Sequence, residues 1–463
     1  MAGEPSLSMQ RQRREIPEPP EFGVINALRF GTDPLRFLDG VQARFNDILA
    51  VPIPGRAPLV IVTNPRLIQE ALSQPDQFTR VSADGAAALI AERGLVQSED
   101  DLWQQQRSIM RPAFGGKQVR AYTNTVGEQV TELADEWAND LTNNPQRNLH
   151  REMTSVTIRV ASKILLGEDI SRDRAEQFYE WMRIAGDELE FSPTSIRPSW
   201  LPNTSSQEMK RAAEGVQELS EEIIERRRAR LADEPDERPA DMLGLLLKAE
   251  DDPSVSYPPN QIRDEVATFL IAGHETTALS LTYTLALLSW NPEARDRVRE
   301  EAIEVLGEDG ATPTHDHVAD LDYTRQVYDE ALRLYPPAWA VFREASSETY
   351  LDGYRVEEGS AVIFPQWSVH RDKRHFPNPR QFDPDRWENQ SPNGTEGYFA
   401  FGAGPHACIG QQLARSGALL VLSHLTQNFD IDVGTDALEN LQATPTLRPS
   451  SGITANVTFS ENN

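Results

Sequence analysis

The single cysteine of the chain lies in a setting that suits it to bind metal. Cys408 belongs to the run FGAGPHACIG (residues 401–410), whose three glycines precede the helical pattern QQLARSGALLVLSHL. Glycines let the backbone approach a bound group closely and let N–H groups point inward. A cysteine at a helix N-terminus is stabilised as the thiolate by the helix dipole and these N–H groups. Such a thiolate is a good axial ligand for haem iron, although a buried core cysteine is the commoner reading of a lone Cys.

A second group of reactive side chains interrupts a long apolar helical pattern. The segment AGHETT (residues 272–277) places an acid and two threonines inside DEVATFLIAGHETTALSLTYTLALL. Gly and Thr are poor residues for a helix interior, and an acid is costly in a core. The pattern therefore suggests a helix that opens locally beside a ligand, where Glu275 and Thr276 could relay protons. A plain helix kink with a surface Glu and Thr is the alternative interpretation.

Residues 401–410 resemble the cysteine-ligand loop of the cytochrome P-450 family: Phe, two residues, Gly, three residues, Cys, one residue, Gly. The family's other signatures occur in the expected order between about residue 60 and residue 458. The resemblance implies haem b as cofactor, Cys408 as axial ligand, and Phe401, Gly402 and Gly410 in the ligand loop. It also implies that Ala272 contacts the haem and that Glu275 and Thr276 are the catalytic pair that delivers protons to bound dioxygen.

Two further motifs match family residues of structural importance. The spacing of Glu330 and Arg333 in EALR puts both charges on one helix face, which in most proteins is a solvated surface pair. In the family this pair is buried and is joined by an arginine that corresponds to Arg386 in FDPDRW (residues 382–387). The resemblance therefore implies a structural triad that fixes the cysteine loop.

The two propionates of a haem need cations and hydrogen-bond donors. The run WQQQR resembles the family's W-x-x-x-R helix, so Trp103 and Arg107 are expected to donate to a propionate. Arg343 and His406 match two further propionate donors. Each could instead be a surface cation or a packing residue. A zinc protease site is excluded, because H-E-x-x-H would need His at the position of Ala278.

The expected elements form a mainly α fold with a smaller β portion, in which the haem lies between a long central helix and the cysteine loop. Residues 59–63 are predicted to be a strand, and Asn64-Pro65 opens a helix. Helical spacing marks residues 119–143, 149–166, 173–190, 205–233, 258–306 and 409–428, whereas 341–365 and the tail carry strand signals. We expect residues 1–34 to be an N-terminal arm and residues 35–463 to be a single haem-thiolate monooxygenase domain.

The charge balance excludes several partner classes. The 463 residues contain 72 Asp plus Glu against 45 Lys plus Arg, a net charge of -27, which argues against nucleic acid or an anionic membrane as partner. Only five of the cations are Lys, so the surface is either adapted to salt, as in a halophile, or is that of an ordinary acidic protein from an Arg-biased genome. No apolar run approaches the ~20 residues of a membrane span, and the N-terminus has no signal core, so we expect a cytoplasmic protein without a membrane span.

The expected activity is insertion of one oxygen atom of O2 into a C–H bond of an apolar small molecule. The alternatives are a haem-thiolate peroxygenase or isomerase and a non-catalytic haem-binding sensor. The chain has neither a flavin domain nor a cysteine cluster, so a separate electron donor is implied, of which an acidic ferredoxin with its reductase is the expected kind. Residues 102–123 contain no acid and match the family's electron-accepting face; their cations are Arg107, Arg111, Lys117 and Arg120. The resemblance places the substrate pocket at residues 86–90, 191–201, 272, 338–341 and 445.

Overall fold

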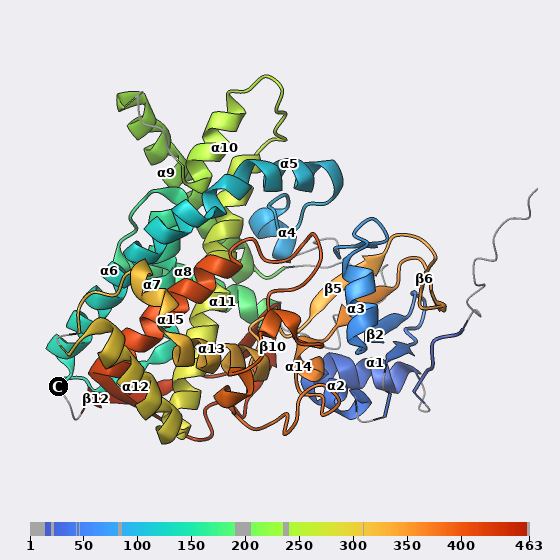
Figure 1. Ribbon diagram of the computed structural model, residues 1–463. Helices are drawn as coiled ribbons and strands as arrows, with labels where there is room; N and C mark the ends of the chain where they lie inside the picture. The colour runs from blue at the N-terminus through green and yellow to red at the C-terminus, as the bar shows by residue number, and fades with distance from the viewer. Residues whose placement is uncertain are drawn as a thin grey trace, which may run out of the picture.

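The computed structural model describes residues 14–19, 23–42, 44–45, 47–81, 86–189, 205–234, 240–308 and 310–460. Helices make up most of this part of the chain, so the prediction of a mainly α fold with a smaller β portion is confirmed. Figure 1 shows the strand-rich part, with α1, α2 and α3, beside the larger helical part. The segment 191–201, expected to line the substrate pocket, lies outside the described residues.

The helices carry the greater share of the fold. The α-helices are α1 (Gly23–Thr32), α2 (Pro34–Gln42), α3 (Pro65–Leu72), α4 (Ala86–Ala91), α5 (Asp100–Met110), α6 (Gly116–Asp140), α7 (Leu149–Ala161), α8 (Arg172–Glu188), α9 (Gln207–Asp233), α10 (Met242–Glu250), α11 (Gln261–Trp290), α12 (Pro292–Leu306), α13 (Asp322–Leu334), α14 (Gln366–Val369) and α15 (Gln411–Asn428). The strands are β1 (Ile48–Val51), β2 (Leu59–Val62), β3 (Phe78–Thr79), β4 (Gln146–Asn148), β5 (Val341–Ala345), β6 (Thr349–Leu351), β7 (Tyr354–Val356), β8 (Ala361–Phe364), β9 (Phe429–Val433), β10 (Leu441–Ala443), β11 (Leu447–Pro449) and β12 (Thr454–Phe459).

Helix α11 is the central element of the helical part. Its 30 residues are apolar on almost every side, so the helix is buried over most of its length, with extensive packing against α7. Gly273 lies at this contact, where a Cβ atom would be 3.4 Å from the Cβ of Ala161, an ordinary packing distance. The sequence pattern over 258–306 is in fact two helices, since Asn291-Pro292 ends α11 and begins α12.

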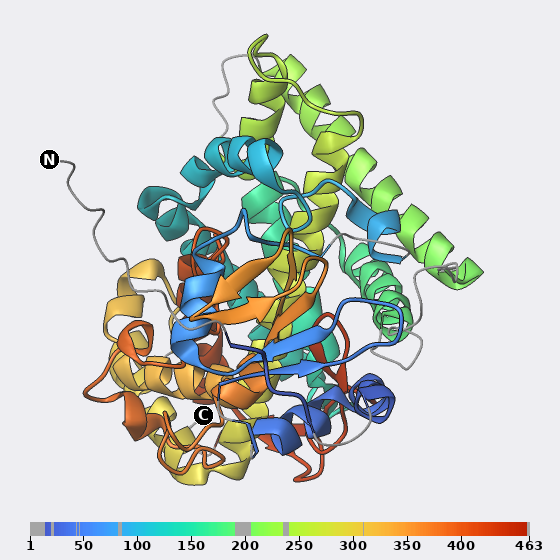
Figure 2. The ribbon, with the colours of Figure 1, turned by 90° about the vertical axis from the view of Figure 1, so that its right-hand side faces the viewer.

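The main sheet has five strands in the order β1-β2-β8-β5-β3, of which only β2 and β8 are parallel. Figure 2 shows these strands in front of the helical part. All four residues of β2 are buried, because alternate side chains enter different apolar clusters on the two faces. Val60 and Val62 pack with Phe364, whereas Ile61 packs with Trp339.

Two segments differ from the sequence expectation. Part of the expected arm 1–34 is helix α1, which packs on the core because Ala27 and Phe30 are buried beside Leu38 of α2. Helix α10 was not anticipated; its nine residues include MLGLLL, and a short continuous apolar run has no clear helical period. Asp241 caps it by accepting a hydrogen bond from the N–H of Gly244 at 2.9 Å.

Candidate active site

The loop that carries Cys408 is a tight turn before α15. The N–H of Cys408 donates to the carbonyl of Phe401 at 2.9 Å, which closes the loop. Gly402 and Gly404 have φ of 74° and 70°, a region that side chains rarely adopt. A Cβ atom at Gly404 would also lie 2.0 Å from the carbonyl oxygen of Leu72, so only glycine fits there. These glycines therefore allow the tight loop conformation in which Cys408 is placed.

Cys408 is surrounded by protein atoms that desolvate its thiol, and yet the residue is exposed. Burial raises the pKa of the Cys408 thiol, against a hydrogen bond from the backbone of Gly410 and the charge of Arg107, which lower it. The cysteine nevertheless has accessible surface. Ala272 is likewise exposed in the middle of α11, although the helix is buried on almost all sides. A flat prosthetic group bound between the cysteine loop and α11 would cover both of these exposed residues.

A cluster of cations lies next to the cysteine loop. Trp103 packs edge-on against His406, with ring centroids 4.3 Å apart, and the guanidinium of Arg107 lies over the Trp103 ring and donates to the carbonyl of Ala407 at 3.0 Å. Burial and the charges of Arg80, Arg343 and Arg107 lower the pKa of His406 to about 3. The four residues assigned to the propionates from sequence, Trp103, Arg107, Arg343 and His406, are therefore brought together.

This cluster fits a dianionic group. The indole Nε1–H of Trp103 is buried and has no hydrogen-bond partner in the described part of the chain, which is costly unless a bound acceptor satisfies it. Three guanidinium groups, from Arg80, Arg107 and Arg343, lie close enough to affect the pKa of one another or of His406. Glu99 contributes one carboxylate to this group, accepting a hydrogen bond from the N–H of Arg80 at 2.5 Å. Two haem propionates would satisfy Trp103 and balance the excess positive charge.

Sequence reasoning missed Arg80 and Glu99. Arg80 directly follows β3, which pairs with β5, the strand that contains Arg343. The side chain of Arg80 also donates to the carbonyl of Leu95 at 2.7 Å. The only signal would have been the pairing of two strands about 265 residues apart, which no local pattern contains.

The structure buries Glu330, Arg333 and Arg386 together. Glu330 and Arg333 are fully buried, and Arg333 donates Nη2 and Nε to the two carboxylate oxygens at 2.7 and 2.9 Å. Arg386 adds a longer contact of 3.4 Å to Glu330, and Trp387 donates its Nε1–H to the same carboxylate at 3.0 Å. Arg333 also donates to three backbone carbonyls, those of His370, Pro379 and Gln381. The group thus fastens α13 to the segment that leads into the cysteine loop.

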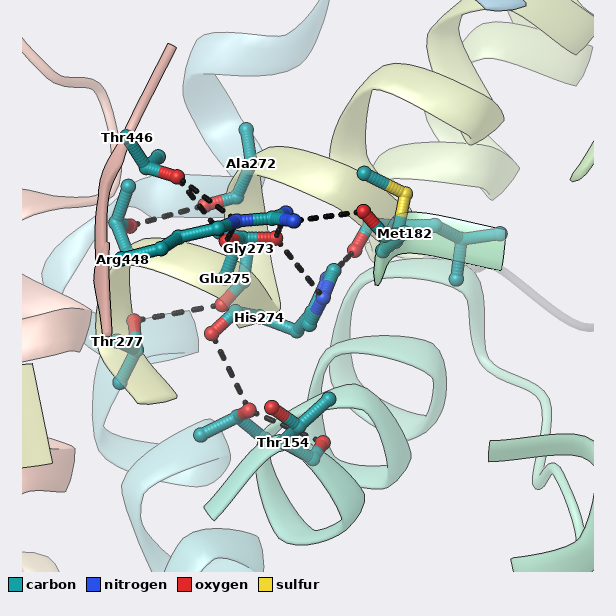
Figure 3. A network of polar contacts seen from close by, with 12 residues as sticks. Thr154, Met182, Ala272, Gly273, His274, Glu275, Thr277, Thr446 and Arg448 are labelled. Atoms are coloured by element: carbon teal, nitrogen blue, oxygen red, sulfur yellow. Dashed lines mark hydrogen bonds and ion pairs between the residues drawn. The ribbon is translucent and has the colours of Figure 1, made fainter. Parts of the chain in front are cut away.

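Glu275 and Thr276 point to different partners. The Thr276 hydroxyl, which is partly accessible, donates to the carbonyl of Ala272 at 3.2 Å. The Glu275 carboxylate is buried and is held by Arg448 and by the hydroxyl of Thr446 (Figure 3). Burial would raise the pKa of Glu275, but Arg448, together with His274 and His150, lowers it to about 2. The carboxylate is therefore ionised and fixed in this conformation.

The acid-free segment 102–123 forms α5, a short 3-10 helix and the start of α6. Arg111, Lys117 and Arg120 are exposed there. Arg120 is partly neutralised, because its Nη2 lies 2.5 Å from a carboxylate oxygen of Asp316. Arg111 and Lys117 are the cations of this segment that are exposed and have no ion pair among the described residues.

Comparison with known proteins decides the family. The family model for cytochrome P450 matches residues 16–457, which is nearly the whole chain. The chain belongs to the cytochrome P450 family. It is 30% identical over 403 residues to cyclooctat-9-en-7-ol 5-monooxygenase of Streptomyces melanosporofaciens, covering 86% of this chain and 84% of the relative. It is 28% identical to pentalenene oxygenase of Streptomyces avermitilis, covering 87% and 88%.

The chain is therefore a haem-thiolate monooxygenase whose cofactor is haem b and which uses O2, an organic substrate and a redox partner. The orphaned indole, the excess of guanidinium groups and the exposed Cys408 all fit that cofactor. None of the helices in the described ranges is both long enough and apolar enough to span a membrane. The described residues also contain no group of three or more His, Cys, Asp or Glu side chains that could hold a separate metal ion.

Proposed function

We propose that this P450 inserts one oxygen atom of O2 into a C–H bond of an apolar substrate, with Cys408 as axial ligand and Glu275 and Thr276 as the catalytic pair. The observation that carries the proposal is the combination of an exposed Cys408 with an exposed Ala272 in a buried helix. The haem, when bound, supplies the activation of dioxygen and the oxidation of the C–H bond.

The residues of this chain then have three tasks. Trp103, Arg107, Arg343 and His406 would hold the propionates, because they supply buried donors and positive charge. The loop glycines leave the backbone close enough for the N–H of Gly410 to donate to the Cys408 sulfur, which favours the thiolate. The hydroxyl of Thr276 donates only a long intrahelical bond to the carbonyl of Ala272, at 3.2 Å, so it could turn and act as a proton donor beside the exposed Ala272.

For the electron donor we propose an acidic ferredoxin, with its reductase, that docks on the exposed cations of segment 102–123. Arg111 and Lys117 support this, because they are free to pair with carboxylates in a protein that is otherwise strongly acidic. Arg107 of the same segment, on α5, points inward to the carbonyl of Ala407, next to Cys408. The docking surface would therefore lie one helix away from the site that receives the electrons.

For the substrate we propose an apolar molecule of the fatty-acid, terpenoid or carotenoid-like kind. The expected pocket residues Ala272, Ala338 and Val341 are small or apolar, which favours contact with hydrocarbon. The relatives support an unsaturated hydrocarbon or alcohol, since one is named for cyclooctat-9-en-7-ol and another for pentalenene. Substrate-induced shifts of the haem absorption, measured with a long-chain fatty acid, a polycyclic terpene and a carotenoid, would choose among these classes.

The test of the function is coupled turnover. Purified holoenzyme with ferredoxin, its reductase and NADPH should consume O2 and form hydroxylated product in proportion. Product formation with hydrogen peroxide alone, and none with the electron-transfer partners, would instead identify a peroxygenase. Haem binding with no product from either oxidant across the substrate panel would contradict the proposal.

A further inference from the structure

Arg448 of β11 connects three elements that lie far apart in the sequence. Its Nε and Nη2 donate to the two carboxylate oxygens of Glu275 on α11, at 2.6 and 2.5 Å, and its Nη1 donates to the carbonyl of Met182 on α8 at 2.7 Å (Figure 3). The side chains of Arg448 and Glu275 are only 12% and 6% exposed. Two parallel bonds fix the direction of a carboxylate as well as its position. Arg448 therefore determines where Glu275 points.

Gly186 of α8 leaves the space through which Arg448 passes. A Cβ atom at this glycine would lie 1.8 Å from Nη1 and 2.7 Å from Cζ of Arg448. The backbone of Gly186 is helical, so no unusual φ requires glycine here, and alanine is the better helix former. The close approach of the guanidinium is thus the physical reason for a glycine at position 186.

A cavity of about 240 Å³ lies against this ion pair. Glu275, His274 and Thr154 form its buried end, whereas Arg183 and Asp187 of α8 are exposed at the other end. Most of the lining is polar and includes His150, Tyr179, Arg448 and Ser450. A polar cavity of this size has room for several water molecules. It extends from exposed residues of α8 to the buried Glu275 of α11.

Among the residues that the structure describes, Arg448 is the only full positive charge that contacts Glu275 at neutral pH. Burial lowers the pKa of His150 to about 4 and also lowers the pKa of His274, so both imidazoles are neutral. The titratable or charged groups that face Glu275 or line the cavity come from every neighbouring element: His150 of α7, Tyr179, Arg183 and Asp187 of α8, His274 and Tyr283 of α11, and Arg448 of β11.

We propose that this cavity is the route by which protons from solvent reach Glu275, and that Arg448 is a positioning residue that keeps the Glu275 carboxylate at its inner wall. The inference rests on the proposed function, in which Glu275 and Thr276 deliver protons. A proton passes from cavity water to a Glu275 oxygen; the neutral carboxyl is then held less strongly by Arg448 and can turn. It passes the proton toward Thr276 and returns to the guanidinium as the carboxylate.

The first experiment is an infrared pH titration of haem-loaded protein. In the wild type Glu275 stays ionised from about pH 5 to pH 9. In Arg448→Gln the carboxyl is buried without its cation, so a C=O band of a protonated carboxyl should appear and titrate within this range. The band should disappear in Arg448→Gln/Glu275→Gln, and Arg448→Lys should largely restore the wild-type behaviour. No such band in Arg448→Gln would overturn the positioning role.

A second pair of variants separates this role from a general structural one. Gly186→Ala keeps every charge but displaces Arg448, so it should release several-fold more peroxide per product than the wild type. Arg299→Gln is the matched control. Arg299 is 11% exposed, donates to Thr426 and Asp430, and is remote from the cavity lining, so its loss should leave the peroxide yield unchanged. Equal yields in Gly186→Ala and the control would contradict the proposal.

The cavity itself is tested by Ser450→Trp. Ser450 is exposed at the outer end, where an indole would obstruct the opening. The solvent deuterium isotope effect on product formation and the peroxide yield should both rise; unchanged values would exclude this route. All variants must first show the carbon monoxide band of the wild type. If the wild type lacks that band, the proposed function fails; if the band is present and the predicted changes are absent, only this inference fails.

Discussion

The buried pair Glu330–Arg333 should be among the strongest single contributions to stability, and Arg333→Met tests this. Methionine is of similar length, so the change removes the charge and leaves little cavity. Both partners are 0% exposed, and the substitution leaves the buried Glu330 carboxylate with only the longer contact to Arg386 as an ion pair. Three backbone carbonyls also lose their donor. Breaking a buried ion pair in this way costs about 3–5 kcal/mol, which is a large part of the 5–15 kcal/mol that stabilises a typical native protein.

The assay is urea unfolding followed by far-ultraviolet circular dichroism. Arg325→Met is the control, because Arg325 makes a pair with Asp322 at the same i,i+3 spacing on the same helix, but at 44% and 71% exposure. The control should lose no more than about 0.5 kcal/mol. Glu330→Gln/Arg333→Met removes the poorly compensated buried charge and should recover part of the loss. A cost below about 1 kcal/mol for Arg333→Met, or a double variant as unstable as the sum of the two single variants, would refute the reasoning.

Three further outcomes are expected. Burial raises the pKa of Glu265 to about 8, so the stability that the neutral carboxyl contributes is complete below about pH 4.5 and is lost as the pH rises through 8. Glu265→Gln should therefore show a smaller decline of the urea midpoint between pH 6 and pH 9 than the wild type. An equal decline in the two proteins would contradict this. Arg111→Glu/Lys117→Glu should slow the first electron transfer at low salt in stopped-flow measurements, with unchanged rates excluding the docking surface. Trp103→Phe removes the unpaired buried donor, so haem transfer to an acceptor apoprotein should become about tenfold faster, and equal rates would show that Trp103 does not hold the cofactor.

Motifs with a fixed spacing could be read from the sequence. The glycines of the cysteine loop predict a tight turn, and Gly402 and Gly404 indeed have positive φ. The pair Asn64-Pro65 predicts the start of a helix, and Asn64 caps that helix by accepting a hydrogen bond from the N–H of Arg66. The spacing of Glu330 and Arg333 predicts an ion pair on one helix face. The family resemblance predicts that this pair is buried, as the structure shows.

What the sequence could not predict depends on contacts between distant segments. Arg80 joins the cation cluster because β3 pairs with β5, and Arg448 reaches Glu275 because β11 lies against α11; neither residue stands in a recognisable motif. Helix α1 was missed since few apolar side chains mark its buried face; those that the structure describes as buried there are Ala27 and Phe30. The single-domain boundary at residue 35 and the salt adaptation of the acidic surface stay predictions.

The most direct test of the account is the absorption spectrum of the purified protein, reduced with dithionite under carbon monoxide. A thiolate ligand from Cys408 predicts a strongly red-shifted Soret band, and Cys408→Ala should lose it while the fold, followed by circular dichroism, is kept. An unshifted band in folded, haem-loaded wild type, or a shifted band that survives in Cys408→Ala, would contradict the assignment of Cys408 as the ligand and with it the proposed chemistry.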